Sequence, residues 1–260
     1  MRTEARERDA PVSSTGLDDL VYPSEGLEGR GRAWRGPRAR GRRYARLDPA
    51  LGARIPIWLA ELAVPEGRAL KAPDVHQVGL LVVKFFTQPS LFGWVRAPRA
   101  VRSAERYFWC LPLRSPRPLL AAGRSTGGPS LLVREHVSGA LLKDVWRNDA
   151  RAEEALAAFL AAMERHGVIH GDLHPRNLLW TGSEWVLLDV DGLRHRLHDP
   201  VRVLTGQWAR FVIHLGDEER VRALHARASQ LAGSRASVPW ERVRRRAEEL
   251  AARRGGASAT

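Results

Sequence analysis

The sequence predicts an α+β fold in two lobes, a small β-rich lobe followed by a compact helical lobe. Strand-like apolar runs rich in β-branched and aromatic residues gather before residue 138, and helical periodicity dominates after it. With 260 residues and 44% hydrophobic content, the chain is long enough to bury a sizeable core. We therefore place the first lobe at residues 46–138 and the second at residues 139–252.

The ends of the chain carry few apolar residues. Glycines and arginines alternate through residues 26–43 with little apolar periodicity, so we expect residues 1–45 to form a basic, disordered arm. Such an arm could touch RNA, a membrane or an acidic glycolipid, or it could be a solvated tail anchored locally by Trp34. Residues 253–260 are expected to fray.

The first lobe should contain four strands and one helix. We expect strands at 55–64, 79–86, 119–122 and 130–137, and a helix at 100–109. The turn after the first of these strands has a single glycine, Gly67, and no G-x-G-x-x-G pattern. The sequence therefore does not identify a glycine loop that would cover phosphates, and we assign Gly67 no phosphate role.

The second lobe should be helical. Helical patterns cover residues 140–146, 150–166, 208–215, 218–231 and 240–252. The helix at 150–166 is the strongest, because Asp149 can cap its first turn and Gly167 can end it. This helix leads directly into the most informative stretch of the chain.

That stretch consists of two apolar runs, each followed by polar residues. The run from Val168 leads into His-Gly-Asp-Leu-His-Pro-Arg-Asn, which places Asp172 and Asn177 five positions apart. The run from Val186 leads to Asp189, a dozen residues further on. This layout is typical of a phosphoryl-transfer site.

The chemistry of phosphoryl transfer explains the residue types. A carboxylate must take the proton of the acceptor hydroxyl, and oxygen ligands must hold Mg²⁺ against the phosphates. Asp172 is our candidate base, and Asn177 and Asp189 are candidate metal ligands, because Mg²⁺ binds few protein oxygens. Asp191 could add a carboxylate at a second metal or at the acceptor. Each residue alone could equally be a structural turn residue; their joint pattern favours a kinase-like site.

Three further positions fit this site. Lys84 interrupts the apolar strand at 79–86, where an ammonium needs a partner or a phosphate ligand. Glu105, on the helix that follows, could pair with Lys84 as in a kinase small lobe. Backbone groups near Glu135 to Val137, at the end of the last strand, could contact an adenine ring. The competing interpretations are an edge-strand lysine and a solvated glutamate.

Composition indicates which partners and which cellular compartment to expect. The net charge is +13, and nearly all basic residues are arginine, since lysine occurs only at Lys71, Lys84 and Lys143. This skew has two explanations, a specific anionic partner or compositional bias. Cys110 is the only cysteine, which excludes an internal disulfide and favours a reducing compartment. No run approaches 18 apolar residues, so we expect a soluble cytoplasmic protein, with peripheral membrane contact as an option.

The motifs VIHGDLHPRNLLW, VLLDVDG, VVKFF and SAER together resemble the bacterial lipopolysaccharide core kinases, the Kdo and heptose kinases of the protein-kinase-like superfamily. The resemblance covers roughly residues 75–215. It implies a two-lobed kinase fold, ATP with Mg²⁺, and a sugar hydroxyl of the lipid A core as acceptor. Applied to this sequence, the resemblance implies that Lys84 binds the phosphates and that Glu105 orients Lys84. It also implies that Asp172 is the base and that Asn177 and Asp189 hold the metal.

Other functions share parts of this pattern. Aminoglycoside and choline phosphotransferases resemble the same loop, but they usually have a longer C-terminal region for their acceptor. An atypical protein kinase and a non-catalytic nucleotide-binding module are further alternatives, although a binding module would not need the base. We expect a nucleotide and a glycolipid or sugar acceptor as partners, possible contact with an anionic membrane, and no nucleic acid.

Overall fold

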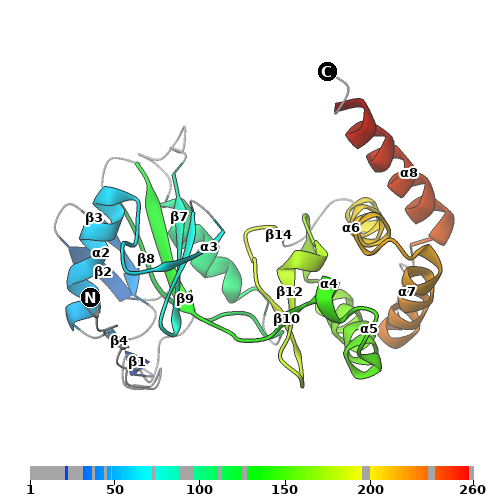
Figure 1. Cartoon of the computed structure of the whole chain (residues 1–260), viewed down its shortest axis with the longest axis horizontal. Helices are drawn as coiled ribbons and strands as arrows, with labels where there is room; N and C mark the ends of the chain where they lie inside the picture. The colour runs from blue at the N-terminus through cyan, green and yellow to red at the C-terminus, as the bar shows by residue number, and fades with distance from the viewer. Residues whose placement is uncertain are drawn as a thin grey trace, which may run out of the picture.

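The structure is a computed structural model, and it confirms the α+β fold class. It describes residues 21–22, 32–36, 39–43, 46–47, 49–71, 74–87, 97–110, 113–124, 128–194, 200–233 and 238–257. Figure 1 shows a part built on a β-sheet, from the N-terminal half of the chain, beside a part built mainly of helices. This is the arrangement of a kinase-like fold.

The N-terminal part is organised around a seven-stranded antiparallel sheet with the strand order β2-β3-β8-β9-β7-β6-β5. Its strands are β2 (Arg32–Gly36), β3 (Ala39–Arg43), β5 (Arg68–Lys71), β6 (Val75–Val78), β7 (Leu81–Phe86), β8 (Pro118–Arg124) and β9 (Ser130–Glu135). A separate short pair joins β1 (Val21–Tyr22) to β4 (Arg46–Leu47). The strands expected around residues 79–86, 119–122 and 130–137 are therefore present, with small shifts at their ends.

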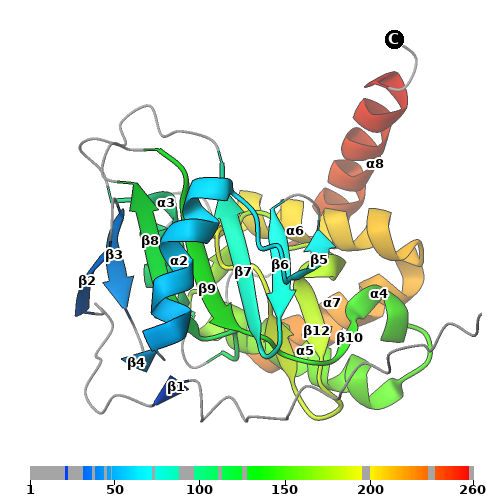
Figure 2. The ribbon, with the colours of Figure 1, turned by 60° about the vertical axis from the view of Figure 1, so that its left-hand side comes forward.

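Each face of this sheet is covered by a helix. Helix α2 (Pro49–Glu61) crosses one face and helix α3 (Arg99–Tyr107) lies on the other, as Figure 2 shows. Along β7, Leu81, Val83 and Phe85 share a hydrophobic cluster with α2, whereas Phe86 packs with α3. Because side chains alternate along a strand, Lys84 lies on the same face as Phe86. The sheet thereby directs the lysine to the side of α3, away from the α2 core.

The structure corrects the strand expected at 55–64, which is the helix α2. Its buried residues Leu51, Ile55, Trp58 and Leu59 recur at three- and four-residue intervals, which is the spacing of one helix face. The β-branched isoleucines favour a strand locally, and Pro56 disfavours a helix interior. Burial of one helical face against the sheet outweighs that propensity.

The structure also differs from the expectation for the basic arm. Residues 32–36 and 39–43 form β2 and β3, and β3 pairs with β8. The backbone of this hairpin is satisfied by ladder hydrogen bonds, which need no apolar periodicity in the sequence. Gly41 is required there, since a Cβ would lie 1.9 Å from the carbonyl oxygen of Ala121.

The C-terminal part begins after β9 and contains two small β-ladders and most of the helices. Its strands are β10 (Ala140–Leu141), β11 (Ile169–His170), β12 (Leu178–Trp180), β13 (Trp185–Leu187) and β14 (Leu193–Arg194). Its helices are α4 (Leu142–Val145), α5 (Ala150–Arg165), the 3₁₀ turn η1 (Pro175–Asn177), α6 (Pro200–Leu215), α7 (Glu218–Ala232) and α8 (Trp240–Ala257). They enclose the largest hydrophobic core of the described residues.

Local signals place α5 as expected. The Asp149 carboxylate accepts a hydrogen bond from the N–H of Ala152 at 3.0 Å, and its other oxygen accepts one from the indole of Trp180 at 3.1 Å. Gly167 follows the helix with a positive φ of 63°. One aspartate thus caps α5 and ties it to β12, the strand that leaves the candidate site.

Two helix ends differ from the sequence expectation. Helix α6 begins at Pro200 rather than near residue 208, and proline suits the first helical turn. Helix α8 runs to Ala257, so residues 253–257 continue the helix rather than fray.

The proposed lobe boundary at 138/139 falls between β9 and β10 and stays a proposal. None of the helices in the described ranges is long and apolar enough to cross a lipid bilayer.

Candidate active site

Two short ladders bring the polar turns together. In one ladder, β12 pairs with β13, and the N–H of Leu188 donates to the carbonyl of Asn177 at 2.8 Å. In the other, β11 pairs with β14, and the N–H of Gly171 donates to the carbonyl of Gly192 at 2.8 Å. The turn carrying Asp172 and the turn carrying Asp189 are therefore fixed to each other on both sides.

His170 connects the same two turns through its side chain. Its Nε2 lies 2.6 Å from the carbonyl oxygen of Asp189, and its Nδ1 accepts the N–H of Asp172 at 3.1 Å. These partners require the neutral tautomer with the proton on Nε2. Burial lowers the pKa of His170, although its bond to the Asp189 carbonyl opposes this. Gly192 is required beside the ring, because a Cβ there would lie 2.4 Å from Cε1 of His170.

The side chain of Lys84, on β7, contacts the turn that carries Asp189 and Asp191. Its ammonium lies 2.7 Å from Oδ2 of Asp191 and 3.3 Å from both carboxylate oxygens of Asp189. The Lys84 and Asp191 side chains are 18% and 15% exposed, so water screens this pair only in part. Sequence and structure thus agree that Lys84 and Asp189 share a site, and Asp191 is the closer partner of the lysine.

Two arginine side chains donate hydrogen bonds to the backbone of this turn. The Arg134 guanidinium donates to the carbonyl of Leu188, and the Arg106 guanidinium donates to the carbonyl of Asp191. Burial lowers the pKa of Arg134, and the nearby Asp189 and Asp191 carboxylates oppose that effect. Burial alone would raise the pKa of Asp189, but Lys84, the Asp191 N–H and Arg134 together lower it. Asp189 is therefore ionised at neutral pH.

Asp172 faces solvent at the mouth of the first turn. Its side chain is 73% exposed, and its carboxylate lies 3.4 Å from Nε of Arg210 on α6. The Asn177 amide donates to the backbone carbonyl of Asp172 at 3.2 Å, which closes the turn. This bond uses the amide nitrogen of Asn177 and leaves its oxygen available as a ligand. The carboxylate of Asp172 is thus accessible to an acceptor.

The structure does not bring Glu105 to Lys84. Among the described residues, the ion pairs of Lys84 go to the two aspartates, and Glu105 pairs with Arg42 of β3 at 3.7 Å. Successive residues of a helix differ by about 100° around its axis, so only one of two neighbours can face the site. On α3 that residue is Arg106, and Glu105 turns toward the edge of the sheet.

The end of β9 only partly matches the expected adenine contact. The N–H of Glu135 donates to the carbonyl of Arg117, and its buried carboxylate accepts from the N–H of Arg117 at 2.9 Å. The N–H of His136 donates to Leu80. No hydrogen bond within the described ranges uses the backbone of Val137. Within the described residues, the backbone of Val137 is thus unengaged by these hydrogen bonds, and the contacts of Glu135 hold the segment in place.

The strands β5 and β6 approach Lys84 at one end. Val75, the first residue of β6, pairs with Lys84 in the sheet, so the end of the hairpin lies level with the lysine. The Gly67 turn precedes β5, at the opposite end of that strand. Lys71 pairs with Val75, so the described ends of both strands lie level with Lys84. The sequence between them contains no glycine. The absence of the expected motif hid this arrangement from sequence analysis.

Sequence analysis missed the supporting arginines. Asp191 stands out in the Asp-Val-Asp pattern, but nothing in the sequence separates Arg106, Arg134 and Arg210 from the other arginines. Arg210 comes 38 positions after Asp172, on a different helix, so only the packing of α6 against β11 and η1 reveals the contact.

Comparison with known proteins agrees with this geometry. Residues 117–237 match the model of the phosphotransferase enzyme family, a span that includes the turns of Asp172 and Asp189 but not Lys84. No curated protein matches the chain. The matched span is 121 of the 260 residues, so the chain is similar to this family over slightly less than half of its length.

Two solved structures illustrate the similarity. One is a crystal structure of WbdD, and the other is described as the bifunctional kinase-methyltransferase WbdD. Each is 18% identical to this chain over 67% of its length, with a TM-score of 0.44. The match covers 43% and 42% of those chains, so this chain spans less than half of the WbdD chains.

Proposed function

We propose that the protein transfers the terminal phosphoryl group of ATP to a sugar hydroxyl of the lipopolysaccharide core, as Kdo and heptose kinases do. One observation supports the reaction above all others. The ammonium of Lys84 and the carboxylate of Asp189 lie 3.3 Å apart, and His170 links Asp189 to the Asp172 turn. A phosphate-binding cation, a metal ligand and a base are thereby within one site.

The described oxygens fit a magnesium ion. Asp189 is ionised, the amide oxygen of Asn177 is available, and Oδ1 of Asp191 is buried with no hydrogen-bond partner among the described residues. These are the hard oxygen donors that Mg²⁺ prefers. Mg²⁺ held by Asn177 and Asp189 would neutralise charge on the phosphates.

Each protein group then has a defined task. Lys84 contacts the phosphates while it keeps Asp191 as its counter-ion, because Asp191 is the closer of its two partners. Asp172 accepts the proton of the acceptor hydroxyl, and Arg210 holds the carboxylate of Asp172 in place. The backbone of Val137 contacts the adenine ring. Asp191, rather than Glu105, orients Lys84.

The resemblance of the motifs to core kinases supports the choice of acceptor. A small-molecule phosphotransferase of the aminoglycoside or choline type is the alternative, and the family match at residues 117–237 fits it as well. We place the reaction in the cytoplasm, at the inner membrane surface where such acceptors lie.

An acceptor panel tests the proposal. The protein is incubated with Mg-ATP and either Kdo-lipid A, core heptose acceptors, an aminoglycoside, choline or a protein substrate, while ADP release and acceptor phosphorylation are measured. We expect phosphorylation of a glycolipid sugar. Phosphorylation of only the aminoglycoside, choline or protein would contradict the proposed acceptor and leave the kinase assignment intact.

A further inference from the structure

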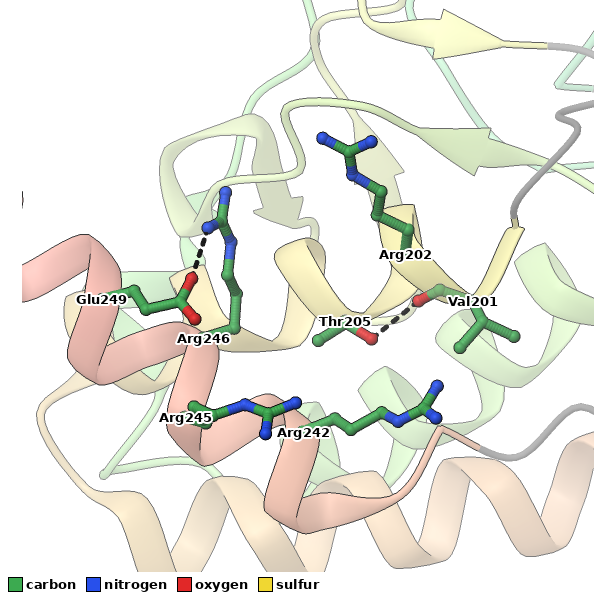
Figure 3. Close-up of a pocket in the computed structure, with 7 residues that line it drawn as sticks. All are labelled: Val201, Arg202, Thr205, Arg242, Arg245, Arg246 and Glu249. Carbon is green, nitrogen blue, oxygen red and sulfur yellow. Dashed lines mark hydrogen bonds and ion pairs between the residues drawn. The ribbon is translucent and has the colours of Figure 1, made fainter.

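A cavity of about 280 Å³ lies between α6 and α8, outside the candidate active site. Four arginines line it, together with Thr205 and one acidic residue, Glu249. Figure 3 shows three of the arginines extending from α8 and Arg202 extending from the first turn of α6. The arginines of α8 are Arg242, Arg245 and Arg246.

The arginines of this pocket outnumber its acidic residues. Glu249 is the only acidic residue among the seven described residues that line it, and it pairs with Arg246 at 2.6 Å. No ion pair within the described part of the chain neutralises Arg242 or Arg245. Elsewhere on α8, Arg244 pairs with Glu241 at 2.8 Å. Within the described residues, Arg242 and Arg245 therefore contribute positive charge to the pocket that no ion pair balances.

The pocket is connected to the candidate base along α6. Arg202, Gly206 and Arg210 follow one another at four-residue intervals, which places them along one ridge of the helix. Arg202 lines the pocket, and Arg210 pairs with Asp172 at 3.4 Å. Eight residues of helix rise about 12 Å, so Arg202 at the pocket and Arg210 at the candidate base lie about that far apart along α6.

Gly206 lies between these two arginines on α6. A Cβ at this position would meet nothing within 4 Å except the Arg210 guanidinium at 3.7 Å. The same guanidinium donates to the carbonyl of Gly206 at 3.3 Å, so the Arg210 side chain extends back along α6 toward Arg202.

We propose that the arginine pocket binds an anionic group, phosphate or carboxylate, of the same acceptor molecule whose hydroxyl lies at Asp172. Arginine guanidinium groups bind phosphate and carboxylate oxygens in pairs, which suits a fixed anion. Because the pocket lies about 12 Å from the base along α6, the acceptor is larger than one sugar. This inference rests on the proposed function for the position of the hydroxyl, and it adds where the rest of the acceptor binds.

Two charge-matched double variants test the pocket. Arg242→Gln with Arg245→Gln removes two pocket charges, and Arg244→Gln with Arg253→Gln removes two charges from exposed positions of α8 outside the pocket. Binding of Kdo-lipid A in detergent micelles is measured in the Asp172→Asn background, where transfer does not occur. Thermal unfolding of each variant shows that it is folded.

We expect about tenfold weaker binding for the pocket variant, because it loses charge-assisted hydrogen bonds, and a change of less than about twofold for the control. In the catalytically intact background, KM for the acceptor should rise by the same factor with kcat unchanged. Kdo-lipid A without its phosphates distinguishes the source of the anion. If the difference between the variants vanishes, the pocket binds lipid phosphate; if it persists, the pocket binds a Kdo carboxylate.

Other results would overturn the inference. Equal weakening by both double variants would mean that only the overall charge matters, and unchanged binding in the pocket variant would mean that the pocket has no role. Absence of binding in the protein with an intact pocket would contradict the proposed acceptor, and the inference that rests on it would fail with it. Tighter binding of a short single-stranded RNA than of the glycolipid, lost in the pocket variant, would identify a nucleic-acid site instead. Pocket-dependent binding without phosphorylation would contradict only the proposed function, whereas phosphorylation with an unchanged KM in the pocket variant would contradict only the pocket.

Discussion

Lys84 and Asp191 form the closest ion pair of the candidate site, and each is mostly buried. Removing one charge of such a pair leaves the other without its partner in a poorly solvated position. The pair therefore links the stability of the protein to Lys84, the residue proposed to bind the phosphates. The two contributions can be separated by substitution.

We predict that Lys84→Met lowers the free energy of unfolding by about 3 kcal/mol, since the Asp191 carboxylate loses its counter-ion. Adding Asp191→Asn should restore most of this stability without restoring phosphoryl transfer. Urea unfolding and an ADP-release assay measure the two effects. Full stability of Lys84→Met would show that the pair does not form.

Arg210 is a positioning residue in this account, because it contacts the base and not the phosphates. We predict that Arg210→Gln lowers kcat about tenfold while the KM for ATP stays unchanged, because an exposed Asp172 carboxylate loses its fixed orientation. Arg222→Gln, at an exposed position of α7, is the matched control. A higher KM for ATP with unchanged kcat would place Arg210 at the nucleotide instead.

Among the elements, the hairpin of β2 and β3 differs most from the sequence-based expectation, which was a disordered arm. Its position in the sheet depends on a close approach of Gly41 to the Ala121 carbonyl. A disordered arm would tolerate any residue at position 41. The two possibilities therefore predict opposite results for one substitution.

We predict that Gly41→Ala lowers the free energy of unfolding by about 2 kcal/mol, because the added Cβ cannot fit without a backbone shift. Gly52→Ala in α2, where a Cβ meets nothing within 4 Å, should be neutral or stabilising by up to about 1 kcal/mol. Chemical denaturation of both variants checks this. Equal stability of the Gly41→Ala variant and the wild type would contradict the pairing of β3 with β8.

His170, which links the two polar turns, makes the stability of the protein depend on pH. Below about pH 6.5 the unfolded chain protonates this histidine, whereas its pKa in the folded protein is lowered by burial. The unfolded state then binds more protons, so stability falls as the pH drops below 6.5. Burial lowers the pKa of His136 and His225 as well, and they add in the same direction.

We predict that the urea midpoint falls between pH 7 and pH 5, and that His170→Asn makes this fall shallower although it destabilises the protein at pH 7. Unfolding curves at pH 5, 6 and 7 measure both slopes. An identical pH dependence in the variant and the wild type would mean that His170 titrates normally in the folded state.

For the whole molecule, sequence analysis predicted best what is local. Asp172, Asn177 and Asp189 are close in sequence and flanked by apolar runs, so their spacing alone indicated one site. Periodicity does not fix the rotation of α3 about its axis, and this rotation decides which residue of α3 faces Lys84. Glu105 therefore pairs with Arg42 in the structure instead of with Lys84. The apolar run at 55–64 fits both a strand and a helix, and only packing on the sheet decides between them.

The contacts that join distant segments could not be predicted at all. Arg210 reaches Asp172 from α6, and the arginine pocket forms only where α6 meets α8. In a chain with arginine at most basic positions, composition does not distinguish these residues from solvent-exposed arginines. Their roles follow from the arrangement of helices around the turns.

The most direct test of the central claim compares wild type with Asp172→Asn in phosphoryl transfer from Mg-ATP to the acceptor found in the panel, and in nucleotide binding. The exposed aspartate Asp144, changed to asparagine, is the control. We predict that Asp172→Asn lowers transfer by at least about a hundredfold and leaves the affinity for ATP unchanged. Transfer at the wild-type rate by this variant would contradict the assignment of Asp172 as the base.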